Sequence, residues 1–145
     1  MRKIGLFMMC AVIIGMVSCE KDEEYVLENG TYYAEDAEFH YGWKGFLEIV
    51  VKNDDLVSVD FDYLNDVGDL KSATTDEEYP MDPHPRVWLP QYEAALLASD
   101  ILAYTDVDAV TGATGGGASV NGLVALLIEA AKTGDTTTQI LPAAE

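Results

Sequence analysis

Basic residues are scarce in this chain of 145 residues: eight lysines and arginines stand against 26 aspartates and glutamates, giving a formal net charge of −18. A surface of this sign repels nucleic-acid phosphates and anionic lipid headgroups. We therefore expect no nucleic-acid partner and no peripheral attachment to anionic lipid. The charge is compatible with simple solubility outside the cell, and it would also steer a cationic partner toward the protein.

Cysteine is equally rare, with Cys10 and Cys19 alone. Arg2 and Lys3 precede the apolar residues 4–17, a pattern typical of an export signal and too short to span a bilayer comfortably. Residues 16–19, Met-Val-Ser-Cys, resemble a lipobox in which methionine replaces the usual leucine. We predict a lipoprotein signal peptide over residues 1–18 and lipidation of Cys19. An ordinary secretory signal and an uncleaved anchor are the alternatives.

Processing at Cys19 would leave no second cysteine in the mature chain. A disulfide, a cysteine-based metal or iron–sulfur site and dithiol redox chemistry are then excluded, so any electron-carrying group must be borrowed. Residues 20–24, Glu-Lys-Asp-Glu-Glu, are acidic and without apolar content. We read residues 19–28 as a lipidated acidic tether that holds the domain off a membrane. The run also resembles a sorting signal for the outer face of the Gram-negative outer membrane, so the periplasmic and cell-surface locations both stay open.

The chain has only two histidines, and it lacks the common nucleotide-binding motifs. His40 and His84 lack cysteine partners, so we predict no structural metal, although Asp82 and His84 could hold an ion weakly. The glycine-rich stretch is not followed by the Gly-Lys-Ser/Thr of a P-loop. No GxGxxG fingerprint follows a predicted strand. Trp43 and Trp88 are core or rim residues in the simplest interpretation, and candidates to stack on a flat cofactor in another.

The remaining pattern predicts one α+β domain over residues 29–134: an antiparallel sheet with a central hairpin packed against helices. Residues 29–34 predict an early strand. Residues 45–52 and 57–63 alternate and predict the hairpin, with Val57, Val59, Phe61 and Tyr63 on one face. Residues 72–90 predict a polar loop, and Pro90 begins a helical pattern. Val120, Leu123, Val124, Leu127 and Ala131 predict a last helix that ends near Gly134, followed by a flexible tail over residues 135–145.

The stretch that organises this pattern is Asp-Ala-Val-Thr-Gly-Ala-Thr, residues 108–114, followed by three glycines. We read it as a loop that leads into the start of the last helix. Small residues would leave the Thr114 hydroxyl uncovered, and unpaired amides at a helix start favour an anion such as phosphate. A plain glycine-rich connection is the alternative interpretation.

Residues 108–114 satisfy every fixed position of Asp-x-x-Ser/Thr-Gly-Ala-Ser/Thr, the acceptor pattern of bacterial flavin transferases. The chain thereby resembles the FMN-binding domains of sodium-pumping NADH:quinone oxidoreductase, of Rnf complexes and of small extracellular lipoproteins. The opening Asn-Gly-Thr-Tyr-Tyr-Ala of residues 29–34 is similar to the family's opening, with Asn29 and Ala34 as departures. The resemblance implies that Thr114 is esterified to the phosphate of FMN by a transferase that uses FAD and magnesium.

The same resemblance assigns roles within the motif. Asp108 is the acidic recognition position, Thr111 and Gly112 shape the loop, and Ala113 keeps it narrow. Gly115 and Gly116 offer backbone amides to the phosphate. The run of Gly115, Gly116 and Gly117 departs from relatives, which place larger residues there, and it predicts a mobile loop or a degenerate site. Asp108 and Thr111 could instead merely close a turn.

The function implied is an exported, membrane-anchored flavoprotein that passes electrons through FMN to unknown redox proteins and is not itself an enzyme. The acidic surface favours cationic proteins as these partners. The alternatives are a cofactor-free surface lipoprotein that binds a protein or ligand, and a flavin reductase.

Overall fold

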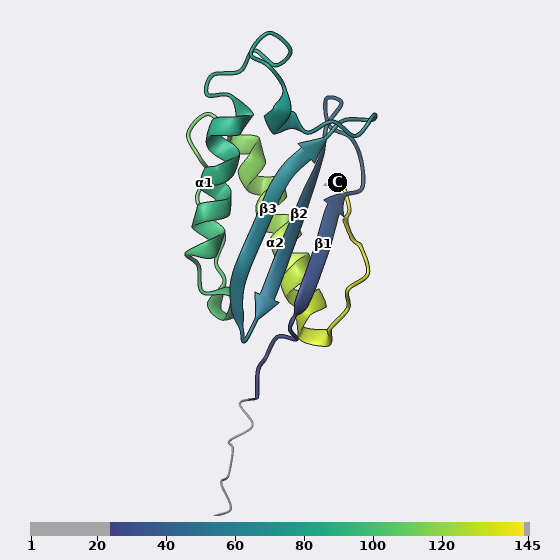
Figure 1. Ribbon diagram of the computed structural model, residues 1–145, viewed down its shortest axis with the longest axis vertical. Coiled ribbons are helices and arrows are strands. Elements are labelled where there is room, and N and C mark those ends of the chain that lie inside the picture. Colours follow the sequence, from purple (N-terminus) through teal and green to yellow (C-terminus); the bar gives the residue numbers. More distant parts are fainter. Residues whose placement is uncertain (1–23, 144–145) are drawn as a thin grey trace, which may run out of the picture.

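The computed structural model describes residues 24–143 and forms an α+β fold with a four-stranded sheet (Figure 1). The strands are β1 (Gly30–Asp36), β2 (Lys44–Lys52), β3 (Asp55–Leu64) and β4 (Gln139–Leu141), in the spatial order β3-β2-β1-β4. The helices are α1 (Pro85–Leu97) and α2 (Thr114–Thr133), with short 3-10 turns η1 (Lys71–Ala73) and η2 (Ile101–Ala103). The predicted signal peptide, lipidated Cys19 and most of the acidic run lie outside the described residues.

The predicted hairpin is present as β2 and β3, joined by a two-residue turn. Asn53 and Asp54 both adopt positive φ, 54° and 64°, as a primed hairpin turn requires. Leu47, Ile49 and Val51 face the core as the alternation predicts. Val57 does not: a register shift at Val50/Val51 leaves it 52% exposed, and Leu56 packs against the core in its place.

Both helices cover one face of the sheet. In Figure 1, α2 runs behind the strands and α1 lies beside β3. The α2 residues that were predicted to face the core are all buried, and Gly134 ends the helix with a φ of 68°. The interior is one cluster that contains Tyr32, Leu47, Phe61, Tyr92 and Leu127. No helix within residues 24–143 is both long and apolar enough to cross a bilayer.

Predictions about the sheet type and about the two ends of the domain are wrong. The sheet is mixed, not antiparallel, because β4 pairs parallel with β1. The predicted flexible tail therefore contains a strand, β4, for which the apolar Ile140 and Leu141 are suited. Leu141 packs against the core. The tether is also shorter than residues 19–28. Leu27 is buried, and the Glu28 amide donates to the Ala131 carbonyl at 2.8 Å.

The first helix begins earlier than predicted, at Pro85 and not at Pro90. His84 precedes it as N-cap, and its side chain accepts from the Arg86 amide. Pro85 occupies the first turn, where a missing N–H leaves no bond broken, whereas Pro90 lies inside the helix. Trp88 and Leu89 therefore join Tyr92 and Leu96 in the buried stripe.

Candidate functional site

The motif ends where α2 begins. Thr114 is the first residue of the helix, and its side chain lies outside what the structure describes. The N-cap is Ala113, which supplies no side-chain hydrogen bond, and the first turn carries no acidic residue. The Gly116 amide, which was predicted to contact a phosphate, donates instead to the Ala113 carbonyl at 2.9 Å. The helix start still carries a partial positive charge and has no side-chain acceptor of its own.

The loop before the helix is tightly folded. Gly112 adopts a φ of 84°, and a Cβ at this position would lie 2.4 Å from Pro83 Cδ. A glycine is thus required both by the positive φ and by the close approach of Pro83. The Ala113 amide donates to the Val110 carbonyl at 2.9 Å and closes the turn.

The glycine run is helical, which corrects the prediction of a mobile loop. Gly116 and Gly117 are buried, whereas Gly115 is exposed. A Cβ on Gly116 would lie 3.2 Å from both Trp88 Cζ3 and Tyr92 Cε2, and a Cβ on Gly117 would lie 3.2 Å from the Tyr92 hydroxyl. Two of the three glycines are therefore explained by rings that pack directly on the helix backbone.

Tyr92 holds the loop and helix together. Its hydroxyl donates to the Ala113 carbonyl at 2.9 Å and accepts from the Val110 amide at 3.0 Å. The side chain is fully buried. No local pattern in the sequence connects Tyr92 with the motif.

A cavity of about 420 Å³ opens beside the start of α2. Its aromatic walls come from four separate segments. They are Tyr41, Trp43, Tyr63, Tyr79 and Trp88. The helix start contributes backbone, through Gly112, Ala113, Gly115 and Gly116. The two tryptophans that the sequence singled out therefore border one cavity.

The aromatic rings interlock edge to face. Tyr63 and Trp88 lie 6.2 Å apart between centroids at 70°, and Trp43 and Tyr79 lie 6.1 Å apart at 87°. Trp88 is buried, and its Nε1–H has no hydrogen-bond acceptor within the described protein. A buried donor without a partner is unusual in a finished interior and marks this wall as a place where another group could bind.

A polar corner lies beside the aromatic walls. The Asp36 carboxylate accepts from the Gly45 amide at 2.9 Å and from the Ser119 hydroxyl at 3.2 Å. Burial raises the pKa of Asp36, although these hydrogen bonds oppose the shift. A Cβ at Gly45 would lie 2.7 Å from Asp36 Oδ2 and 2.8 Å from Ser119 Oγ, so a larger residue here would displace this pair of side chains.

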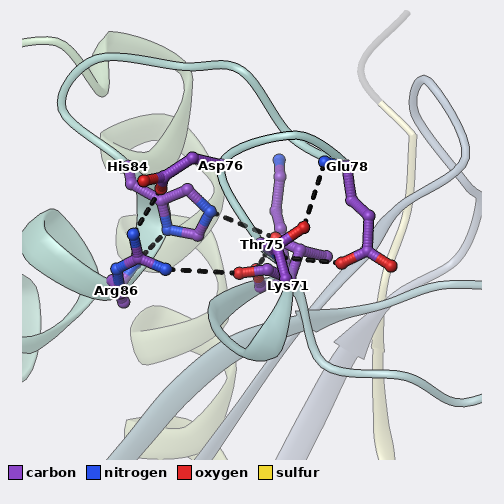
Figure 2. Close-up of polar contacts among 7 residues, drawn as sticks. Lys71, Thr75, Asp76, Glu78, His84 and Arg86 are labelled. Carbon is purple, nitrogen blue, oxygen red and sulfur yellow. Dashed lines mark hydrogen bonds and ion pairs between the residues drawn. The ribbon is translucent and has the colours of Figure 1, made fainter.

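The loop between η1 and α1 folds on itself (Figure 2), and its Tyr79 and Met81 border the cavity. Arg86 forms an ion pair with Asp76, and the Glu78 carboxylate accepts from the Thr75 amide at 2.8 Å. His84 Nδ1 accepts from the Arg86 amide at 3.3 Å, while its Nε2 lies 3.3 Å from the Thr74 hydroxyl. His84 is thus engaged at both ring nitrogens. Within residues 24–143, no group of three or more histidine, cysteine, aspartate or glutamate side chains could hold a metal ion.

The remaining predicted residues lie outside the cavity wall. Asp108 and Thr111 are exposed, and neither side chain makes a hydrogen bond among the described residues. The predicted alternative, that they close a turn through their side chains, is therefore absent. Sequence reasoning missed Asp36, Lys71, Tyr79 and Ser119, which come from four separate segments and carry no local signal.

A second hollow, of about 430 Å³, lies beside the C-terminal half of α2 and includes Leu27, Ile101, Leu102 and Ile128. It lies where the N-terminal segment joins the domain. Aliphatic residues dominate its lining, and no residue of the motif borders it. The cavity at the start of α2 is therefore the stronger candidate for chemistry.

The comparisons with known proteins agree with this architecture. No protein-family model matches the chain. The CPE2226 protein of Clostridium perfringens, known from a crystal structure, superposes with a TM-score of 0.74 at 24% identity over 81% of this chain and 99% of that one. That likeness shows a shared fold. A solution structure from Clostridium thermocellum gives a TM-score of 0.46 at 25% identity, over 78% and 95% of the two chains, and carries no argument.

One curated relative covers almost the whole sequence. The "15 kDa lipoprotein" of Treponema pallidum (strain Nichols) is 33% identical over 140 residues, which are 93% of this chain and 95% of that protein. Identity at this level along nearly the full length of both proteins indicates common descent. The chain belongs to the family of the Treponema pallidum 15 kDa lipoprotein.

Proposed function

We propose that this protein is a membrane-tethered, extracytoplasmic electron carrier with FMN attached covalently through a phosphoester to Thr114. The observation that carries the proposal is the position of the acceptor motif. Residues 108–114 lead directly into an uncapped helix start that borders an aromatic cavity. A simple glycine-rich connection would not need such a cavity.

The residues present fit the two halves of FMN. An isoalloxazine is flat and largely apolar, and Trp43, Tyr63 and Trp88 line the cavity with aromatic side chains. The volume of about 420 Å³ lies in the usual range of small-molecule sites. The free Trp88 Nε1–H supplies a donor for a polar edge of the ring.

The phosphate half fits the helix start. Ala113 provides no competing side-chain cap, and Gly115 is exposed with nothing within 4 Å of where its Cβ would lie. Backbone amides at this end of α2 favour a bound anion, in a chain whose net charge otherwise repels one. Gly112, Ala113, Gly115 and Gly116 would thus surround the attachment point of Thr114.

When bound, FMN supplies reversible electron transfer, and the protein supplies position, electrostatics and exclusion of water. The packing of Trp88 and Tyr92 on Gly116 fixes the helix start relative to the aromatic wall. We therefore assign an electron carrier and not an enzyme with its own substrate.

Lipid anchoring is the second part of the proposal. The lipobox-like residues 16–19 support it, as does the name of the T. pallidum relative. The N-terminal segment enters at one end of the sheet, whereas the start of α2 lies at the other end (Figure 1). A lipid on Cys19 would thus leave the cavity directed away from the anchor, open to a periplasmic or cell-surface partner.

The experiment is mass spectrometry of the full chain, expressed with export and with a flavin transferase. Trypsin releases residues 87–132 as one peptide, because no lysine or arginine lies between Arg86 and Lys132. We expect this peptide to gain the mass of FMN less one water. Thr114→Ala should abolish the gain, and Thr105→Ala, an exposed threonine of the same peptide, should retain it.

The host must also flavinylate a second, established acceptor protein. An unmodified wild-type peptide in that host would refute the proposal and leave a cofactor-free binding lipoprotein. A gain that persists in Thr114→Ala would refute the attachment residue.

A further inference from the structure

Lys71 is held over three aromatic rings of the cavity. Its Nζ lies 4.6 Å from the ring centroid of Tyr63, 4.7 Å from that of Tyr79 and 5.6 Å from that of Trp43. The side chain also lines the cavity. Its backbone is fixed, because the Lys71 carbonyl accepts from the Thr74 hydroxyl at 2.7 Å and the neighbouring Ser72 binds the Asp62 carboxylate.

Lys71 is also unpaired in a strongly acidic protein. Within residues 24–143, the basic side chains of Lys44, Arg86 and Lys132 each form an ion pair with a carboxylate. Lys71 and the exposed Lys52 form none there, although acidic residues outnumber basic ones more than threefold, and of these two only Lys71 lines the cavity. An aromatic cage attracts a cation but leaves its charge uncompensated. The charge is thereby kept available to whatever occupies the cavity.

We propose that Lys71 sets the reduction potential of the bound FMN by placing its ammonium group against the isoalloxazine ring. This inference rests on the proposed function. The oxidised ring is neutral. Two electrons from a donor protein and one proton from water give a reduced ring with one negative charge, and the reverse reaction delivers the electrons to an acceptor protein. A positive charge beside the ring stabilises the reduced form more than the oxidised form.

The test is the midpoint potential of the flavinylated full chain and of three variants. Lys71→Met removes the charge and keeps the length, whereas Lys71→Arg keeps the charge. Lys52→Met is the matched control, because Lys52 is exposed at the β2–β3 turn and changes net charge equally. We expect Lys71→Met to lose about tenfold in preference for the reduced ring, which corresponds to about 30 mV more negative for a two-electron couple. Lys71→Arg and Lys52→Met should stay near wild type.

The possible outcomes separate this inference from the proposed function. If the wild type carries no FMN while the transferase modifies its control protein, both fail. If the wild type carries FMN and Lys71→Met has the wild-type potential, only the role of Lys71 is overturned. If Lys71→Met keeps its melting temperature but is no longer flavinylated, Lys71 serves attachment and the assignment to the ring is wrong. An equal shift of the midpoint potential in Lys52→Met would also overturn the proposed role of Lys71.

Discussion

At the scale of single residues, the absence of side chains at the start of α2 shapes the site. Gly116 faces buried rings of Trp88 and Tyr92 at 3.2 Å, whereas Gly115 faces open space. Both residues have helical backbone, so alanine would relieve the entropy loss of glycine at either one, by up to about 1 kcal/mol. The surroundings of each glycine therefore decide whether alanine raises or lowers the free energy of unfolding.

We predict that Gly115→Ala raises the free energy of unfolding by about 0.5 kcal/mol. Gly116→Ala should lower it by about 1 kcal/mol, because fully packed rings cannot move aside without strain. Urea unfolding of both variants measures the difference. Equal stabilisation by the two alanines would contradict the packing of Trp88 and Tyr92 on the helix.

At the scale of elements, patterns local to one segment could be predicted and contacts between segments could not. The alternation in β2 and β3 predicted the hairpin, and the spacing from Val120 to Ala131 predicted the buried face of α2. The bulge that exposes Val57 could not be predicted, because it depends on how the two strands pair. The start of α1 was misplaced because proline fits a first turn at both Pro85 and Pro90.

The candidate site follows the same division. The motif and the small residues around Thr114 are contiguous, so the sequence alone indicates a helix start that favours an anion. The aromatic wall is assembled from the loop before β2, from β3, from the loop before α1 and from α1 itself. Lys71 and Tyr79 fall in a stretch without periodicity, and nothing in that stretch indicates a common cavity.

The N-terminal segment offers a test at this scale. Asp54, in the β2–β3 turn, accepts hydrogen bonds from the amides of Leu27 at 2.7 Å and Val26 at 3.0 Å. Asp54→Gly removes the carboxylate and retains a residue suited to a φ of 64°. We expect hydrogen exchange at Val26 and Leu27 to accelerate about fivefold, the equivalent of about 1 kcal/mol for the lost bonds. Exchange should be unchanged in Asp55→Ala, whose side chain makes no hydrogen bond.

At the scale of the whole molecule, buried carboxylates make stability depend on pH. Burial raises the pKa of Asp36 and of the half-buried Glu93 in the folded protein. A raised folded pKa means that the native state binds more protons than the unfolded state between the two values. The stabilising contribution is complete below the ordinary carboxyl pKa of about 4 and is lost as the pH rises through the folded values.

We therefore predict that the free energy of unfolding falls as the pH rises from 4 toward 7. The decline should persist in high salt, which screens repulsion between the many surface carboxylates. Asp36→Asn, which imitates the protonated side chain, should flatten the decline, whereas Asp66→Asn, an exposed position, should not. Urea unfolding at each pH measures this. A curve that rises with pH would show that the carboxylates stabilise the fold in their charged form.

Net charge would also govern how the proposed flavoprotein meets an electron acceptor. With a formal charge of −18, the chain, if it carries reduced FMN as proposed, should attract a cationic acceptor and repel an anionic one. Hexaammineruthenium(III) and ferricyanide are small acceptors of opposite charge, so their salt dependences can be compared in stopped-flow oxidation. Raising the ionic strength from about 0.01 M to 0.15 M shortens the Debye length from about 30 Å to about 8 Å. We expect the reaction with the cation to slow about tenfold or more, and the reaction with the anion to accelerate. If both rates respond alike, the surface around the cavity is not acidic enough to select its partner, and the proposed cationic redox protein loses its physical basis.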